Sequence, residues 1–343
     1  MRTFNVAMNG MGSVNKTLSG ILEEKRKVLA EKYGVRFNIV MISDSSGIAV
    51  KTDGFDMDKV VTHKNDGGWI AELVGYQNKS FSDLLIAHDV DLVWEASPVD
   101  FKTGGEALEI TRAALSRGIS VVLANKGPVV KAHGELKAIA NKTAAGFKYS
   151  ATVCGGLPIL NIGERDMIAG QILEFSGVFN GTCNFILDAL KNGISFDNAV
   201  KEAQNVGAAE ADPSLDIDGW DTAFKLLIIA NHVMGAGITL ENINVNGIRS
   251  ITAEMIRAEE SQGNTIKLVA SFDGRDYKVE PTVVAKEGFI GSCTGWEMGI
   301  EIHSDLYGIM YHKLYEKEPI PTAASMMRDA VNIFSCLNHN KVT

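Results

Sequence analysis

An alternation of apolar runs with helix-like segments in the first 150 residues constrains the fold more than any other feature of this sequence. Each run has the apolar, β-branched composition of a buried strand, and the segments between the runs repeat apolar residues at helical spacing. The expected strands are residues 3–8, 37–43, 91–97, 119–125 and 147–153, and helices are expected near 105–117 and 134–144. This alternation predicts an α/β domain with a doubly wound parallel sheet.

A glycine-rich turn follows the first predicted strand and leads into a helix-like segment. Gly10 permits a tight turn, and Gly12 lets the backbone approach a pyrophosphate at the helix start, where Ser13 and Val14 lie. Asn15 stands where dinucleotide-binding turns usually have a third glycine, so the motif alone fits a structural turn equally well. Its place between a strand and a helix favours a Rossmann-type, dinucleotide-binding domain.

Polar side chains at the ends of later strands extend this prediction, because parallel sheets bind ligands at the carboxyl ends of their strands. Asp44 ends the second strand, where a carboxylate can accept hydrogen bonds from the adenosine ribose. No arginine follows it, which favours NAD over NADP, although Lys51 or Lys64 could reverse that preference. Ser97 ends the third strand and is expected near the nicotinamide half of the cofactor. Lys126 ends the fourth strand and points either into the crevice or into solvent.

Composition narrows the class of protein. The length of 343 residues suits two domains, and the formal net charge of -9 argues against nucleic acid or an anionic membrane as partner. No apolar run is long enough for a transmembrane helix, and the start of the chain is not a signal peptide. The four cysteines and seven histidines are scattered, so a cytoplasmic protein without disulfides or a transition metal is expected.

The segment 207–225 is strongly acidic and ends in a lysine. It contains Glu210, Asp216, Asp221 and Lys225. Apolar residues then recur at helical spacing, so a helix is expected to begin just before Asp221. Asp221 and Lys225 would share one helix face, where they could hold an amino-acid substrate and transfer a proton. On spacing alone, a solvent-exposed helix pair explains the same residues more simply.

Several ordered motifs together resemble a known family. They are Gly10-x-Gly12, Ala124-Asn125-Lys126, Gly155-Gly156-x-Pro158, Asn180-Gly181-Thr182, and Gly207-x-Ala209-Glu210-x-Asp212-Pro213 followed by Asp216, Asp221 and Lys225. Over nearly the whole chain they resemble homoserine dehydrogenase, which interconverts L-aspartate 4-semialdehyde and L-homoserine with a nicotinamide cofactor. The acidic segment is the most specific part of this resemblance, which makes the solvent-exposed pair the less favoured interpretation.

The resemblance implies a role for each of these residues. Glu210 and Asp221 would bind the ammonium group of the substrate, and Asp216 would support them. Lys225 would donate the proton to the forming alkoxide, and Lys126 would be a second catalytic or orienting cation. The other implied residues are Gly181 and Thr182 for the substrate and Thr322 for the cofactor.

The resemblance also implies how the chain is divided. A dinucleotide-binding domain over residues 1–150 would be completed by a C-terminal helix within 321–343. An α+β domain over 151–320 would bind the substrate and pair two subunits into a homodimer. No residues remain after Thr343 for the effector-binding module of some relatives, so feedback inhibition through such a module is not expected.

Two departures from the family leave alternatives open. Ser150 stands where many relatives have a glutamate beside a monovalent-cation loop, which puts a cation at the carbonyls of Val153 and Gly155 in doubt. Residues 311–320 replace a Gly-Ala-Gly-rich turn that lies against the cofactor, and they bring lysines that could contact a phosphate. The alternative functions are a dehydrogenase of another small amino-acid aldehyde or ketone, and a cofactor-binding homologue without activity.

Overall fold

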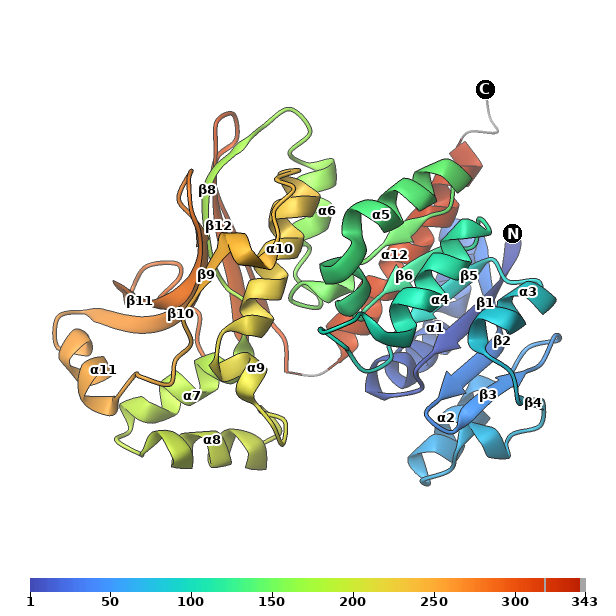
Figure 1. The fold of residues 1–343 in the computed structure, drawn as a ribbon, viewed down its shortest axis with the longest axis horizontal. Coiled ribbons are helices and arrows are strands. Elements are labelled where there is room, and N and C mark those ends of the chain that lie inside the picture. The colour runs from blue at the N-terminus through green and yellow to red at the C-terminus, as the bar shows by residue number, and fades with distance from the viewer. Residues whose placement is uncertain (318, 340–343) are drawn as a thin grey trace. The chain divides into compact units, whose positions relative to one another are not determined.

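The computed structural model describes residues 1–317 and 319–339, with side chains as far as residue 335. The chain forms two compact units (Figure 1). Unit 1 comprises Met1–Gly156 and the C-terminal segment from Pro319, and unit 2 comprises Leu157–Lys317. The sequence predicts the two boundaries at residues 150 and 320.

Unit 1 alternates strands and helices around one sheet. Its elements are β1 (Arg2–Asn9), α1 (Ser13–Tyr33), β2 (Val35–Asp44), β3 (Gly47–Val50), α2 (Met57–Asn65), η1 (Ile70–Glu72), β4 (Tyr76–Gln77), α3 (Phe81–Ala87), β5 (Leu92–Glu95), α4 (Gly105–Ser116), β6 (Ser120–Leu123), α5 (Gly127–Thr143), β7 (Phe147–Lys148), η2 (Ser150–Thr152) and α12 (Ile320–His339). The strand order is β4-β3-β2-β1-β5-β6-β7, and all strands except β3 and β4 are parallel. The predicted doubly wound parallel sheet is confirmed, with two short antiparallel strands that the sequence analysis did not identify.

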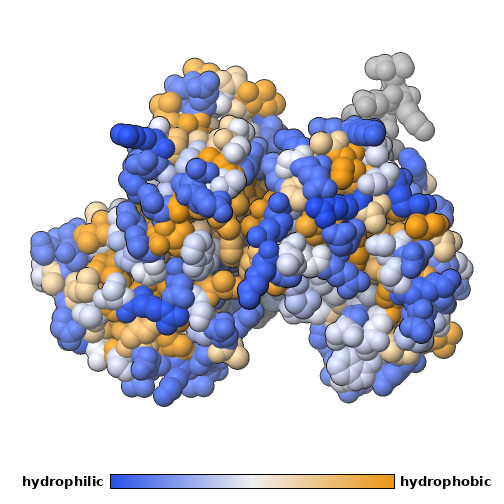
Figure 2. All heavy atoms as spheres, viewed as in Figure 1, coloured by the Kyte–Doolittle hydropathy of each residue, from blue (hydrophilic) through white to orange (hydrophobic). Residues whose placement is uncertain are grey.

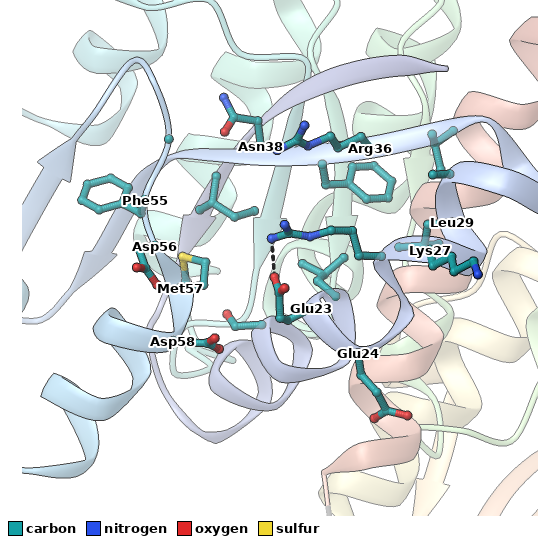
Figure 3. A pocket seen from close by; sticks show the side chains of 18 of the residues that line it. Glu23, Glu24, Lys27, Leu29, Arg36, Asn38, Phe55, Asp56, Met57 and Asp58 are labelled. Atoms are coloured by element: carbon teal, nitrogen blue, oxygen red, sulfur yellow. Dashed lines mark hydrogen bonds and ion pairs between the residues drawn. The ribbon is translucent and has the colours of Figure 1, made fainter.

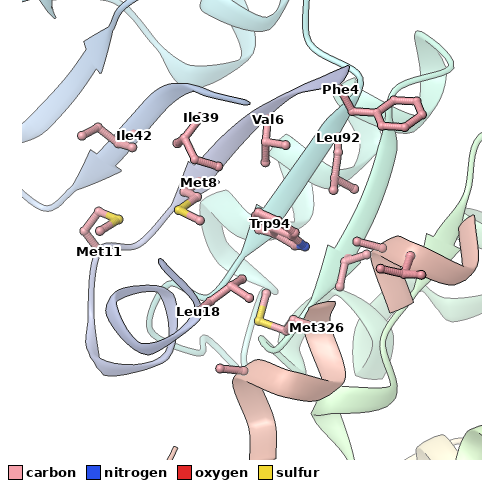
Figure 4. Packing of buried hydrophobic residues seen from close by; sticks show 14 of the residues in the cluster. Phe4, Val6, Met8, Met11, Leu18, Ile39, Ile42, Leu92, Trp94 and Met326 are labelled. Carbon is pink, nitrogen blue, oxygen red and sulfur yellow. The ribbon is translucent and has the colours of Figure 1, made fainter. Parts of the chain in front are cut away.

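The core of unit 1 contains residues from the sheet, from α1 and from α12. Phe4 and Met8 of β1, Trp94 of β5 and Leu18 of α1 are all buried there (Figure 4). Helix α12 packs against α1, and the ring of Phe334 stacks on Phe4 with 3.7 Å between ring centroids. Because burial of large aromatic side chains dominates core energetics, the C-terminal helix is an integral part of unit 1.

Two elements near the end of the sheet differ from the prediction. The strand expected over 147–153 stops at Lys148, because the N–H and the hydroxyl of Ser150 donate to the carboxylate of Asp329 at 2.9 and 2.7 Å. These bonds turn the chain away from the sheet and towards α12. Helix α5 begins at Gly127 instead of near residue 134, with Pro128 in its first turn and a kink at Ala132.

Unit 2 has an α+β arrangement, as predicted. Its elements are α6 (Ile159–Arg165), β8 (Ile172–Val178), α7 (Gly181–Lys191), α8 (Phe196–Asn205), α9 (Ser214–Ile217), α10 (Trp220–Val233), η3 (Leu240–Asn242), β9 (Ile243–Val245), α11 (Ala253–Glu260), β10 (Asn264–Phe272), β11 (Tyr277–Ala285), β12 (Glu297–Ser304) and β13 (Gly308–Tyr315). The strand order is β13-β12-β8-β10-β11-β9, antiparallel except for the β11–β9 pair. Helices α7 and α10, which carry the predicted substrate residues, pack against β10.

The surface is mixed in character. Figure 2 shows hydrophilic residues over most of the visible face of each unit, with hydrophobic residues in small groups between them. Among the helices formed by residues 1–317 and 319–339, none combines the length and apolar character needed to span a bilayer.

Candidate functional site

Two turns meet at the carboxyl edge of the unit 1 sheet, where β1 and β5 are neighbours. The chain continues from β1 to β2 on one side and from β5 to β6 on the other, so this edge is a switch point of the kind where α/β proteins bind ligands. Gly10 follows β1 with a φ of +83°, and a Cβ added there would lie 2.6 Å from the Cα of Ser97. Glycine is therefore required for the turn after β1 to contact the turn after β5.

Gly12 has a different reason to be glycine. It is the N-cap of α1 with extended backbone angles, and a Cβ added there would meet no described protein atom within 4 Å. Ser13 and Val14 are the first two residues of α1, and N–H groups at such positions have no carbonyl partner within the helix. The open turn and the helix start fit a pyrophosphate, which stays a prediction for Gly10, Gly12, Ser13 and Val14.

Asn15 occupies the place of the missing third glycine and is fully buried. Its Nδ2 donates to the carbonyl of Asn9 at 3.0 Å and to the carbonyl of Gly10 at 3.1 Å. The side chain thus supplies a donor to two carbonyls and ties the first turn of α1 to the glycine turn. The departure from the usual fingerprint adds a cross-link to this turn.

Asp44 ends β2 as predicted, and its carboxylate has partners within unit 1. Lys64 of α2 lies 2.5 Å from it, the hydroxyl of Ser46 also lies at 2.5 Å, and the N–H of Ile70 donates at 3.3 Å. Burial opposes ionisation, but these hydrogen bonds outweigh it and hold the pKa of Asp44 below its ordinary value of 3.8. Asp44 is therefore an ionised carboxylate neutralised by Lys64, whose side chain is only 12% exposed.

The other predicted cofactor residues lie at the starts of helices α5 and α12. Lys126 is the half-buried N-cap residue of α5. The preceding Asn125 donates to the carbonyl of Ser97 at 3.1 Å and accepts from the N–H of Gly127 at 2.9 Å. Asn125 therefore joins the turn after β5 to the start of α5. Thr322 is half-buried in the first turn of α12.

In unit 2, Asp221 and Lys225 form the ion pair that the sequence predicted on α10. The Lys225 Nζ lies 2.8 Å from the Asp221 carboxylate and donates to the carbonyl of Phe179 at 2.5 Å. The two side chains are only 11% and 14% exposed, for Lys225 and Asp221 respectively. The solvent-exposed pair is therefore the wrong interpretation, because most of this ion pair is covered by the fold.

Asn180 joins this pair to a second carboxylate. Its Nδ2 donates to Asp216 at 2.6 Å and to Asp221 at 3.1 Å, while its Oδ1 accepts from the N–H of Cys183 at 2.8 Å and caps α7. From the sequence, Asn180 belongs to a motif and has no predicted role in the site. Asp216 and Asp221 lie 36 and 41 residues further along the chain, so periodicity and local spacing gave no sign of these contacts.

The remaining predicted substrate residues lie around the start of α7. Gly181 and Thr182 form its first turn, and the Thr182 hydroxyl donates to the carbonyl of Ala208 at 2.6 Å. This bond anchors the loop that leads to Glu210. Glu210 is exposed, and within the described structure its carboxylate forms no hydrogen bond or ion pair with the aspartates or the lysine of the cluster.

The loop after η2 has an unusual backbone. Cys154 and Gly155 both have left-handed angles, with φ of 52° and 49°. Ser150, which precedes this loop, bonds to Asp329 of α12, so a carboxylate is present there although the sequence lacks the family's glutamate. No group of three or more histidines, cysteines, aspartates or glutamates within the described residues could hold a metal. A monovalent cation at the carbonyls of Val153 and Gly155, which the sequence puts in doubt, stays untested.

Residues 311–315, where the family has a glycine-rich turn, belong to strand β13. Lys313 donates to the carbonyl of Ser292 at 2.8 Å and pairs with Glu297 at 3.1 Å. His312 is partly buried, and burial lowers its pKa. Lys313, which the sequence analysis considered as a phosphate contact, is thus engaged by partners within unit 2.

A cavity of about 870 Å³ lies between α1 and residues 51–58 (Figure 3). Charged residues of both signs line it, including Glu23, Arg36 and Asp58, together with the apolar Phe55. It also contains Met1 and Val35, so it lies where β1 and β2 begin. Since parallel sheets bind ligands at the carboxyl ends of their strands, its volume alone does not make it the functional site.

Comparison with known proteins finds relatives along nearly the whole chain. A family model described as homoserine dehydrogenase matches residues 158–331. A homoserine dehydrogenase of Methanocaldococcus jannaschii is 32% identical, over 96% of this chain and 98% of its own. A NAD(+)-dependent homoserine dehydrogenase of Pseudomonas canavaninivorans is 28% identical, over 97% of each chain.

Solved structures agree with this finding. The homoserine dehydrogenase of Thiobacillus denitrificans has a TM-score of 0.84 at 26% identity, over 99% of this chain and 75% of that chain. A mutant of a hyperthermophilic archaeal homoserine dehydrogenase in complex with NADPH also has a TM-score of 0.84 at 26% identity, over 97% of this chain and 98% of that chain.

Proposed function

The chain belongs to the homoserine dehydrogenase family, and from that premise we propose how its two units divide the reaction. The reaction is the reversible, NAD(P)-dependent reduction of L-aspartate 4-semialdehyde to L-homoserine. Unit 1 binds the nicotinamide cofactor, and unit 2 binds the amino acid and supplies the proton. The observation that carries this proposal is the largely buried Asp221–Lys225 pair, which Asn180 connects to Asp216.

Lys225 is the proposed proton donor. Reduction of an aldehyde adds a hydride to carbon and a proton to oxygen, and the bound cofactor supplies the hydride. The Lys225 ammonium group stabilises the negative charge that develops on the oxygen and then donates a proton to it. Asp221 and the carbonyl of Phe179 orient this ammonium group.

The carboxylates around Lys225 are the proposed partners of the substrate's ammonium group. Asp216 and Asp221 are held together by one amide, and Glu210 is exposed on the loop that Thr182 anchors. Gly181 and Thr182 begin α7, where N–H groups at the helix start suit the carboxylate of the amino acid.

The cofactor residues follow the switch point of the unit 1 sheet. Gly10, Gly12, Ser13 and Val14 are assigned to the pyrophosphate, and Asp44 to the adenosine ribose. Ser97, Lys126 and Thr322 are assigned to the nicotinamide half. The fit rests on the Gly10–Ser97 contact and on the open space at Gly12.

NAD is the proposed preferred cofactor. Asp44 disfavours NADP, and Lys64 weakens that discrimination. A 2′-phosphate would meet the Asp44 carboxylate, whereas Lys64, at 2.5 Å from Asp44, offsets that repulsion. Lys64→Met is expected to raise the ratio of kcat/KM with NAD to kcat/KM with NADP about tenfold, because like charges brought together are strongly unfavourable. The exposed Lys59→Met on the same helix is the control, and a ratio that stays constant or falls in Lys64→Met would contradict this role.

The test of the function is the formation of reduced nicotinamide from L-homoserine, first with NAD and then with NADP. Two other hydroxy amino acids provide the comparison of chain length. They are L-serine, one methylene shorter than homoserine, and L-2-amino-5-hydroxypentanoate, one methylene longer. A clear preference for homoserine supports the proposal, and a preference for another length identifies a different amino-acid dehydrogenase. Saturable NADH binding without turnover of any substrate would identify a homologue that has lost its activity.

A homodimer is the proposed assembly. Strand β13 is the edge strand of the unit 2 sheet, and it exposes Ile309, Tyr311 and Tyr315 by 52%, 53% and 62%. An exposed apolar edge of this kind favours pairing with another chain. Light scattering on the purified protein should give twice the mass of the chain, and the mass of a single chain would contradict the proposal.

A further inference from the structure

Glu95 is a fully buried carboxyl group beneath the two turns of the switch point. It is the last residue of β5 and has no exposed surface. Its Oε1 accepts from the N–H of Ser97 at 2.8 Å and from the Ser97 hydroxyl at 2.5 Å. Its Oε2 accepts from Nδ2 of Asn9, the last residue of β1, at 2.6 Å. One side chain therefore holds the ends of both strands from which the Gly10 and Ser97 turns start.

The hydrogen bonds around Glu95 have a consistent direction. Asn125 Nδ2 donates to the Ser97 hydroxyl at 3.3 Å, which leaves the Ser97 hydrogen for Glu95. The Ser43 hydroxyl donates to Oδ1 of Asn9, which leaves the Asn9 amide to donate to Glu95. Every one of these partners donates to the carboxyl group, an arrangement that suits its ionised form because only a carboxylate acts purely as an acceptor.

This carboxyl group has an unusual environment. Burial raises the pKa of Glu95, while the bonds from Ser97 and Asn9 oppose that rise. The partners found in the described part of the chain are amide, N–H and hydroxyl groups, with no lysine or arginine among them. Buried carboxylates are normally paired with a cation. The oxidised nicotinamide ring carries a positive charge, and the reduced ring does not.

On the basis of the proposed cofactor function, we propose that Glu95 is a positioning residue of the cofactor crevice whose negative charge favours the oxidised cofactor over the reduced one. The carboxylate sets the Ser97 turn, and through Asn9 it sets the end of β1 just before Gly10. Its charge acts at the edge of the sheet assigned to the nicotinamide half. A purely structural role would affect both redox forms of the cofactor equally, so the two roles give different results.

The test compares the dissociation constants of NAD⁺ and NADH for the purified full chain, measured by calorimetry without substrate. Glu95→Gln keeps the shape of the side chain and removes the charge, and it replaces one acceptor oxygen by an NH₂ group, which disturbs positioning for both redox forms alike. We expect it to weaken NAD⁺ binding about tenfold more than NADH binding, since an uncompensated charge acts strongly in a buried site. Glu135→Gln, which removes an exposed carboxylate paired with Arg112, is the control and should change neither constant.

Glu95→Asp keeps the charge and shortens the side chain, so it tests positioning even if the glutamine variant does not fold. It should weaken both redox forms by a similar factor, and two unchanged constants would overturn the proposal. Equal changes for NAD⁺ and NADH in Glu95→Gln, or no change, would overturn it as well. A wild-type chain that binds neither form would overturn the proposed function together with this proposal. If the wild type binds both, an unaffected Glu95→Gln overturns this proposal alone.

Discussion

Asn180 keeps two carboxylates of the candidate site close together. Its single amide nitrogen donates to both Asp216 and Asp221, and its oxygen is used by the N–H of Cys183. An aspartate here would have nearly the same shape, yet it would lose both donated bonds and add a third negative charge to the cluster. The arrangement of charge around Lys225 therefore depends on a neutral residue.

We predict that Asn180→Asp lowers kcat/KM for homoserine about 10- to 100-fold, the effect of losing one or two hydrogen bonds to charged groups. The dissociation constant for NADH should stay within about twofold of wild type, because unit 1 holds the assigned cofactor residues. Steady-state kinetics and a fluorescence titration measure the two quantities. Asn198→Asp on the exposed face of α8 is the matched control. A normal kcat/KM in Asn180→Asp would show that Asn180 does not organise the site.

At the scale of elements, α1 begins with a hydrogen-bonded cross-link instead of a third glycine. Asn15 donates to the carbonyls of Asn9 and Gly10 and is fully buried. Asn15→Gly would restore the usual fingerprint and yet should lower the free energy of unfolding by about 1–3 kcal/mol, because two bonds are lost and glycine disfavours the helix. Urea unfolding measures this change. The free energy of unfolding of Asn15→Ala is expected to lie between those of wild type and Asn15→Gly. A glycine variant as stable as wild type would contradict the account.

Asp273, in the turn between β10 and β11, is expected to make a contribution to stability that depends on pH. Asp273 accepts hydrogen bonds from the N–H of Asp276 at 2.9 Å and from the Lys278 ammonium at 2.7 Å, which lowers its pKa from 3.8 to about 2. A carboxyl group with a depressed folded-state pKa adds stability that is present above its unfolded pKa and is lost as the pH falls through the folded value.

Asp273→Asn should therefore lower the melting temperature at neutral pH. The difference from wild type should shrink as the pH falls from 3.8 to about 2, where the wild-type carboxyl group also becomes neutral. Calorimetric melting at several pH values measures this difference. A difference that stays constant down to the lowest pH would show that the charge of Asp273 is not responsible.

Long elements with clear periodicity were predictable, and short ones were not. The helix expected just before Asp221 is α10, and the alternating strands of unit 1 lie in the expected sheet. Strands β3 and β4 have four and two residues, too few to show a pattern. The early end of the strand after Phe147 depends on a bond from Ser150 to Asp329, which is 179 residues away. Local sequence contains no sign of such a contact.

The same limit of local sequence applies to the candidate site. Motif spacing placed Asp221 and Lys225 on one helix face, and the structure shows them as an ion pair. The supporting residues escaped prediction because their partners are distant in sequence, as with Glu95 and Asn9, which are 86 residues apart. The sequence thus predicted Asp221 and Lys225, which are assigned to the chemistry. The fold adds the supporting groups, which are the amide of Asn180 and the buried carboxyl group of Glu95.

The proposed division of roles is that unit 2 supplies the proton through Lys225 while unit 1 binds the cofactor. It is tested most directly by kcat for homoserine oxidation and the NADH dissociation constant of Lys225→Met, side by side with wild type. Lys191→Met, which removes a helix lysine that also pairs with an aspartate, is the control.

We expect Lys225→Met to lower kcat by about 10²–10⁴, the size expected for loss of a general acid–base group, with NADH binding nearly unchanged. Lys191→Met should keep a kcat close to that of wild type. A Lys225→Met variant that retains kcat within a few-fold of wild type would show that another residue donates the proton.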